Sequence, residues 1–132
     1  PKGAVIGGEK RKLTVMMADL RGFTAMSESM TPEAVTDILN CFFDEMLQCI
    51  TKYYGVVIEF LGDAILAVFG ASPDSKAQIE EGITAGIKMQ KAMAKVNDYI
   101  ISKGLVPLEM GNWHTSRRSI YRKFRIRNDD AI

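Results

Sequence analysis

The stretch Leu13-Thr14-Val15-Met16-Met17-Ala18-Asp19 decides the fold of this chain, together with Leu61-Gly62-Asp63-Ala64 further along. The first stretch is an almost continuous apolar run of strand length that ends at Asp19, and the second places Asp63 between two apolar runs. Each aspartate stands where a strand ends or turns. Two such carboxylates side by side would offer hard oxygen ligands to Mg²⁺ on a substrate's phosphates, although both could also be ordinary turn aspartates.

The composition allows one domain with a change of character near its end. The chain has 132 residues, of which 47% are hydrophobic and 25% charged, which is typical of a single globular core. Residues 1–110 hold 11 Lys and Arg against 14 Asp and Glu, whereas residues 111–132 hold 6 against 2. We therefore expect a linker at 1–9, a folded domain at 10–110 and a basic, atypical tail at 111–132.

The location of the protein is predicted from what its sequence lacks. No segment has the roughly 20 apolar residues that span a bilayer, and residues 1–12 lack the apolar core of a signal peptide. We expect no membrane contact by this segment and a cytoplasmic location, alone or as the cytoplasmic domain of a larger protein. Cys41 and Cys49 lie eight positions apart on one predicted helix, about 12 Å, and are expected to be reduced core thiols.

A long helix is predicted from Thr31 to Tyr54. Thr31 is a favourable N-cap, Pro32 suits the first helical position, and Gly55 is placed to terminate the helix. Apolar residues recur every three or four positions and define one buried face. These residues are Val35, Ile38, Leu39, Phe42, Phe43, Met46, Ile50 and Tyr53.

The second half of the chain predicts a hairpin, a helix and a strand. Residues 56–60 and 64–69 read as two strands joined by a turn that contains Gly62 and Asp63. A helix is expected at about 76–103, closed by Gly104, and a fourth strand is expected to begin within 105–110. The helix residues expected to be buried are Ile79, Ile83, Ile87, Met89, Met93, Val96 and Ile100.

This order of elements predicts an α+β fold. A strand, a helix, a hairpin, a helix and a strand form a split β-α-β arrangement, with a ferredoxin-like antiparallel sheet and both helices on one face. The end of the first strand and the tip of the hairpin then become neighbours. Asp19 and Asp63 are therefore expected to converge.

Two motifs carry a resemblance to a known family. Asp19-Leu20-Arg21-Gly22-Phe23-Thr24, followed by a long helix and then Phe60-Leu61-Gly62-Asp63-Ala64, resembles the catalytic domain of the class III adenylate and guanylate cyclases. The similarity runs from about Lys10 to Met110. It implies a domain that is incomplete at its C-terminus, since members of this family continue beyond that point.

The resemblance implies an activity and a set of ligands. Asp19, Asp63 and the backbone carbonyl of Leu20 would hold two divalent ions, Mg²⁺ or Mn²⁺. The substrate would be a purine nucleoside triphosphate, ATP or GTP, whose ribose 3′-hydroxyl attacks the α-phosphorus so that pyrophosphate leaves. The turn of Arg21, Gly22, Phe23 and Thr24 would give backbone N–H groups to the phosphates. The product would be a 3′,5′-cyclic monophosphate used in intracellular signalling.

Glu59 is the candidate base-recognition residue. Adenylate cyclases usually carry a lysine four positions before the second metal aspartate, whereas this chain has Glu59. A carboxylate accepts hydrogen bonds, and guanine offers donors at N1 and the 2-amino group, whereas adenine N1 is an acceptor. Glu59 therefore resembles the choice of guanylate cyclases. The alternative is an outward polar position on an alternating strand.

The sequence departs from the family after Met110. The resemblance implies a glycine-rich turn of the type Gly-Ile-His-Thr-Gly and, downstream, an Asn and an Arg that stabilise the transition state, and this chain lacks them. A plausible codon string for the stretch that begins at Asn112, shifted by one base, reads Ile-Gly-Ile-His-Pro-Gly. We therefore hypothesise that residues 111–132 are an out-of-frame product.

Two classes of function follow. The first is a cyclase fragment that is inactive alone, because family active sites form between two subunits, in a homodimer or with another cyclase domain. The alternative is a noncatalytic module that dimerises or binds an anionic partner through its tail. The basic residues of the tail, with Trp113 and Tyr121, could also suggest nucleic acid, but none is expected as a partner. His114 has no acid or nucleophile near it in sequence and is assigned no catalytic role.

Overall fold

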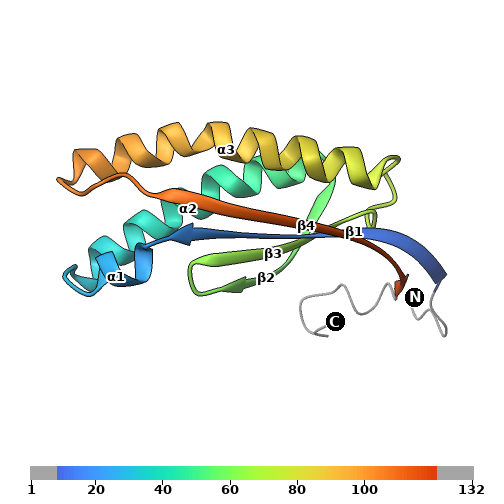
Figure 1. Ribbon diagram of the computed structural model, residues 1–132, viewed down its shortest axis with the longest axis horizontal. Coiled ribbons are helices and arrows are strands. Elements are labelled where there is room, and N and C mark those ends of the chain that lie inside the picture. Colours follow the sequence, from blue (N-terminus) through green and yellow to red (C-terminus); the bar gives the residue numbers. More distant parts are fainter. Residues whose placement is uncertain (1–8, 122–132) are drawn as a thin grey trace.

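The computed structural model describes residues 9–121, with side chains described from Lys12 to Thr115. Its elements are β1 (Glu9–Arg21), α1 (Phe23–Ser27), α2 (Pro32–Lys52), β2 (Gly55–Leu61), β3 (Ala64–Phe69), α3 (Gln78–Ser102) and β4 (Glu109–Tyr121). The four strands form one antiparallel sheet in the order β2-β3-β1-β4, and α2 and α3 lie on the same face of it (Figure 1). The predicted α+β fold with a ferredoxin-like sheet is confirmed.

Alternate residues of β1 face opposite sides of the sheet. Met16, Ala18 and Leu20 are buried against the helices, and residues 65, 67 and 69 of β3 join them in the core. Asp19, Arg21 and their neighbours at odd positions point to the other side, which we call the open face. Neither long helix covers the open face (Figure 1). Asp19 therefore lies on the accessible face of a sheet whose other face is packed against the helices.

The helix α2 follows the predicted pattern except at its end. The Thr31 side chain accepts a hydrogen bond from the Ala34 N–H at 3.1 Å. The helix ends at Lys52, and the positive φ of 67° belongs to Tyr54. The prediction that Gly55 terminates the helix is therefore wrong. Gly55 opens β2, where a Cβ would lie 2.6 Å from the Phe69 ring. The fully buried α2 residues all come from the predicted face: Ile38, Phe42, Met46 and Ile50.

The helix α3 turns a different face to the sheet from the one expected. Ile79, Ile83 and Ile87 are 43%, 49% and 52% exposed, so the prediction that they are buried is wrong. Small residues face the sheet in this half of the helix: Gly82, Ala85 and Gly86. They do so because the helix lies close to β4. A Cβ at Gly86 would approach the His114 ring to 2.8 Å. The other expected positions, Met89, Met93, Val96 and Ile100, are buried.

The connections also differ in detail from the predictions. The short helix α1 was not predicted; it forms because Gly22 adopts a φ of 79° and Phe23 is buried beneath the turn. The strand β4 begins at Glu109 and continues through Tyr121, so residues 111–121 of the expected tail pair with β1. Glu9, the last residue of the expected 1–9 linker, begins β1, while residues 1–8 of that linker and residues 122–132 of the expected tail lie outside the described residues.

The described helices contain no segment with the length and apolarity needed to cross a bilayer. The two cysteines of α2 are unpaired and partly buried. Burial, reinforced by the nearby Glu45 carboxylate, raises the pKa of the Cys41 and Cys49 thiols. Both are therefore held in the protonated, weakly reactive form.

Candidate functional site

The sheet brings Asp19 and Asp63 to the same end. Asp19 lies near the end of β1 opposite Ala64, the residue that directly follows Asp63. The Leu20 N–H donates a hydrogen bond to the Asp63 carbonyl at 3.3 Å. The two residues between β2 and β3 make the turn, in which Gly62 has a φ of 63° that suits glycine. The first strand and the hairpin tip are thus neighbours.

One carboxylate oxygen of Asp19 has no partner. Asp19 Oδ1 is buried and makes no hydrogen bond within the described part of the chain. Such an oxygen is costly to bury unless a donor or a cation satisfies it. Between Lys12 and Thr115, no cluster of three or more His, Cys, Asp and Glu side chains could hold a metal by itself. A cation here would therefore also need backbone or substrate oxygens as ligands. The unpartnered Asp19 Oδ1 fits the role of a carboxylate ligand in such a site.

Gly111 of β4 lies beside the Asp19 carboxylate. It lies directly opposite Asp19 in the β1–β4 ladder and is buried. A Cβ at Gly111 would lie 2.7 Å from Asp19 Oδ1 and 2.6 Å from Arg21 Nε. Glycine at this position therefore allows the carboxylate and the guanidinium to occupy the same side of β4. The sequence did not single out Gly111, because the tail that follows it hides the strand to which it belongs.

Arg21 places a positive charge on the open face next to Asp19. Its side chain is exposed, and its Cζ lies 5.6 Å from the centre of the Trp113 ring, within range of a cation–π contact. The turn that follows is anchored by Phe23, which is 3% exposed, while Gly22 and Thr24 remain accessible. The predicted phosphate-binding turn is therefore held at the same end of the sheet as both aspartates.

A bulge directs Glu59 to the open face. The register of β2 shifts between Val57 and Glu59, so Glu59 lies opposite Leu66. Leu66 in turn lies opposite Met17, two residues before Asp19 on the same face of β1. Without the extra residue, Glu59 would face the helices. The bulge thus places the candidate base-recognition residue, which is exposed, on the same face as Asp19. No pattern in the sequence indicated this bulge.

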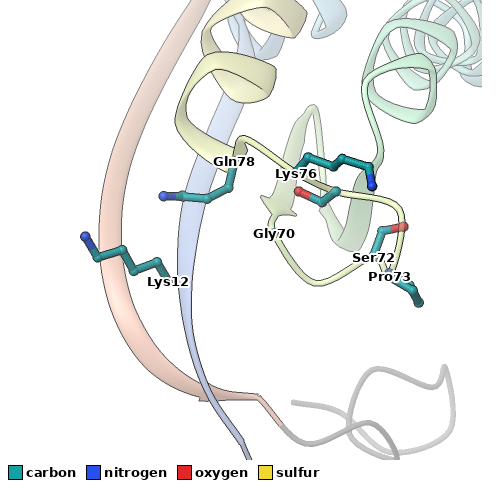
Figure 2. Close-up of a pocket in the computed structure, with 7 residues that line it drawn as sticks. Lys12, Gly70, Ser72, Pro73, Lys76 and Gln78 are labelled. Carbon is teal, nitrogen blue, oxygen red and sulfur yellow. The ribbon is translucent and has the colours of Figure 1, made fainter.

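A polar cavity lies at the other end of the sheet (Figure 2). It has a volume of about 290 Å³ and is lined by Lys12, Gly70, Ser72, Pro73, Ser75, Lys76 and Gln78. Lys12 is near the start of β1 and Gly70 follows β3, so the cavity is remote from Asp19. The side chains of Lys12 and Lys76 point in opposite directions (Figure 2). This cavity is therefore not part of the aspartate site.

His114 is also outside the aspartate site. It lies opposite Met16 on the helix-covered side of β4, and its Nε2 is hydrogen bonded to the Gly82 carbonyl at 2.8 Å. On the same side of β4, Asn112 Oδ1 is buried without a hydrogen-bond partner among the described residues. A Cβ at Gly86 of α3 would lie 2.8 Å from the His114 ring and 3.2 Å from Asn112 Oδ1, so both side chains lie against this helix. His114 is otherwise exposed and lies on the opposite side of the sheet from Asp19.

Comparison with known proteins places this site in a family. Residues 7–111 match the family model of the adenylate and guanylate cyclase catalytic domain. The chain is 34% identical over 88 residues to an adenylate cyclase of Anabaena cylindrica, which covers 67% of this chain and 16% of that protein. The chain thus spans only a small part of this curated relative.

Solved structures agree with that match. The guanylyl cyclase Cya2 superposes with a TM-score of 0.80 at 40% identity, covering 86% of this chain and 58% of that one. The adenylyl cyclase CyaB from P. aeruginosa gives a TM-score of 0.76 at 32% identity, with 85% and 59% covered. The sheet, the two motifs and these matches together assign the chain to the class III adenylate and guanylate cyclase catalytic domain family.

Proposed function

We propose that this chain carries the metal-binding half of a nucleotidyl cyclase active site. The observation that supports it most is the unpartnered, buried Oδ1 of Asp19 beside the Asp63 turn. Asp19, Asp63 and the Leu20 carbonyl would hold two divalent ions, Mg²⁺ or Mn²⁺. Such ions, when bound, neutralise phosphate charge and favour ionisation of the attacking hydroxyl.

The substrate in this proposal is a purine nucleoside triphosphate. Its ribose 3′-hydroxyl attacks the α-phosphorus, a new phosphorus–oxygen bond closes the ring, and pyrophosphate leaves. The turn from Arg21 to Thr24 binds the phosphates, because its backbone is held by buried Phe23 while Gly22 admits close approach. We propose that this reaction belongs to intracellular signalling in the cytoplasm.

Within this proposal, the Glu59 side chain favours guanine over adenine as the bound base. Its carboxylate accepts hydrogen bonds, which matches the donors on the Watson–Crick edge of guanine. Its position on the open face, on the same side of the sheet as Asp19, is compatible with base recognition. The similar structures include both a guanylyl and an adenylyl cyclase. An assay with ATP and with GTP therefore decides which nucleotide is the substrate.

This chain alone is proposed to lack turnover. The downstream Asn and Arg that the family uses in the transition state have no counterpart after Met110. Its partner in this proposal is a second copy of the chain, in a homodimer that would contain the metal half twice, or another cyclase domain that supplies the second half.

The test is to incubate the chain with Mn²⁺ and either ATP or GTP and to quantify cyclic AMP and cyclic GMP. We expect no turnover above background from the chain and expect turnover from its full-length parent. Robust turnover by the chain that disappears in Asp19→Ala would refute the proposed inactivity. Nucleotide binding that needs neither metal nor Asp63 but weakens steeply with salt would instead favour the noncatalytic anion-binding alternative.

A further inference from the structure

The side chain of Arg21 has no role in the function proposed above, which uses only the backbone of its turn. Arg21 lies two residues after Asp19 in β1, so the two side chains point to the same side of the sheet. A Cβ at Gly111 would lie 2.6 Å from Arg21 Nε, 2.9 Å from Arg21 Nη2 and 2.7 Å from Asp19 Oδ1. The guanidinium and the carboxylate therefore lie next to each other over Gly111.

The charges of Arg21 and Asp19 are neighbours, but this carboxylate oxygen is not bound to the guanidinium. Asp19 Oδ1 is buried and accepts no hydrogen bond from any group in the described part of the chain. A guanidinium is a permanent cation. Arg21 therefore offsets part of the negative charge of Asp19 through space, without satisfying the oxygen that a metal ion would use.

Trp113 holds the guanidinium in this position. Arg21 Cζ lies 5.6 Å from the centre of the Trp113 ring, and Trp113 is on the open face because it pairs with Met17. Both the arginine and the tryptophan are exposed. A cation–π contact at an exposed site is weak, so it positions the guanidinium and still lets it move away.

A metal ion and the guanidinium would both be attracted to the Asp19 carboxylate. Two positive groups beside it repel each other, whereas the phosphates of a nucleotide offer a displaced guanidinium paired hydrogen-bond acceptors. We propose that Arg21 is a displaceable counter-charge for Asp19, so that a divalent ion binds poorly alone and well together with a nucleoside triphosphate. This inference rests on the metal site of the proposed function and adds a coupling between the metal ion and the nucleotide.

The experiment compares Mn²⁺ alone with Mn²⁺ bound to a nucleotide. Mn²⁺ is titrated into the full chain and the free ion is quantified by electron paramagnetic resonance. The Mn²⁺ complex of α,β-methylene GTP, which cannot be cyclised, is titrated by calorimetry. The test variant is Arg21→Gln. Its matched control is Lys12→Gln, which removes the same charge from an exposed position near the start of β1, too far from Asp19 for an unscreened effect.

Arg21→Gln is expected to change the two affinities in opposite directions. Free Mn²⁺ should bind about tenfold more tightly because the repulsion is removed, and the nucleotide complex should bind about fivefold more weakly because a phosphate partner is lost. Lys12→Gln should change neither affinity. Arg21→Lys keeps the charge and should bind free Mn²⁺ nearly as weakly as the unmodified chain. A loss of both affinities in Arg21→Gln would overturn the proposal in favour of a structural role for this side chain.

Trp113 is the single tryptophan of the chain, so its fluorescence reports the position of the guanidinium. Mg²⁺ replaces Mn²⁺ in this measurement because it does not quench fluorescence, and the excitation wavelength is one that the nucleotide does not absorb. Binding of Mg²⁺ and α,β-methylene GTP should change the emission of the unmodified chain and change that of Arg21→Gln much less. Identical emission from these two chains without ligands would overturn the contact and the proposal with it.

Failure of this inference and failure of the proposed function give different results. Equal affinity of Arg21→Gln and of the unmodified chain for free Mn²⁺, with binding lost in Asp19→Asn, would overturn the inference and leave the metal site in place. If neither chain binds Mn²⁺, with or without the nucleotide, both the metal site and this inference are overturned.

Discussion

Asp19 and Gly111 face each other across the β1–β4 ladder, and a methyl group at Gly111 would come within 2.7 Å of Asp19 Oδ1. This separation is shorter than real Cβ contacts allow, so any larger residue at 111 must displace the carboxylate or the strand. Gly111→Ala is therefore expected to weaken Mn²⁺-dependent nucleotide binding about tenfold, as measured by isothermal titration calorimetry. The exposed Thr115→Ala on the same strand is the control and should bind normally. Unchanged binding by Gly111→Ala would show that the carboxylate position is not critical.

Asn112 is expected to be a destabilising residue. Its Oδ1 is buried without a hydrogen-bond partner in the described part of the chain, and its Nδ2 has only a 3.8 Å contact with Met16 Sδ. Asn112→Leu keeps the branching of the side chain and removes the unsatisfied polar atom. We predict an increase of about 1 kcal/mol in the free energy of unfolding, measured by urea denaturation. A decrease would mean that the amide is satisfied in solution.

We also predict that residues 111–132 are translated out of the cyclase reading frame. When the codon string that begins at Asn112 is shifted by one base, it encodes an isoleucine near position 112 and another near position 114. These are the two positions of β4 that face the glycines of α3. Aliphatic side chains there would remove the unsatisfied amide of Asn112. Sequencing the parent gene is expected to reveal an intact cyclase frame immediately downstream of the codon for Gly111. If no such frame exists there, residues 111–132 are not an out-of-frame product.

Glu81 stabilises the start of α3 in a pH-dependent way. Burial opposes its charge, but hydrogen bonds from the Ser75 hydroxyl and from the Lys76 and Ala77 N–H groups outweigh burial and lower the pKa of Glu81 below its ordinary value of 4.5. A depressed pKa in the folded state gives stability that is complete above the unfolded-state pKa and lost as pH falls through the folded-state value. Glu81→Gln should therefore cost about 1 kcal/mol of unfolding free energy at pH 7, and the difference should shrink below about pH 4.5. A difference that is constant between pH 7 and pH 3 would contradict this account.

The sequence predicted those parts of the fold that depend on local pattern. The apolar run before Asp19, the cap at Thr31 and the hairpin at Gly62 each follow from short-range chemistry and are found where expected. The convergence of the two strand ends followed from the order of elements. The resemblance of both motifs to a cyclase then proved correct at the level of the family.

The remaining features depend on contacts that a single sequence does not reveal. The bulge in β2 changes which face Glu59 occupies, although the alternating pattern gave no sign of it. The burial of Ile83 was mispredicted because α3 approaches β4 through glycines, which leaves its isoleucines outside. Gly111 was missed because its importance comes from residues on the neighbouring strand.

The most direct test of the central claim is whether Asp19 and Asp63 act together on a metal. Calorimetric titration with Mn²⁺ and a non-cyclisable GTP analogue should give metal-dependent binding that falls at least about tenfold in Asp19→Asn and in Asp63→Asn, with little further loss in the double variant. Asp37→Asn, an exposed aspartate on α2, should bind as the unmodified chain does. Binding that is independent of metal, or that survives both substitutions, would contradict the claim that these two carboxylates form the metal-binding half of a cyclase site.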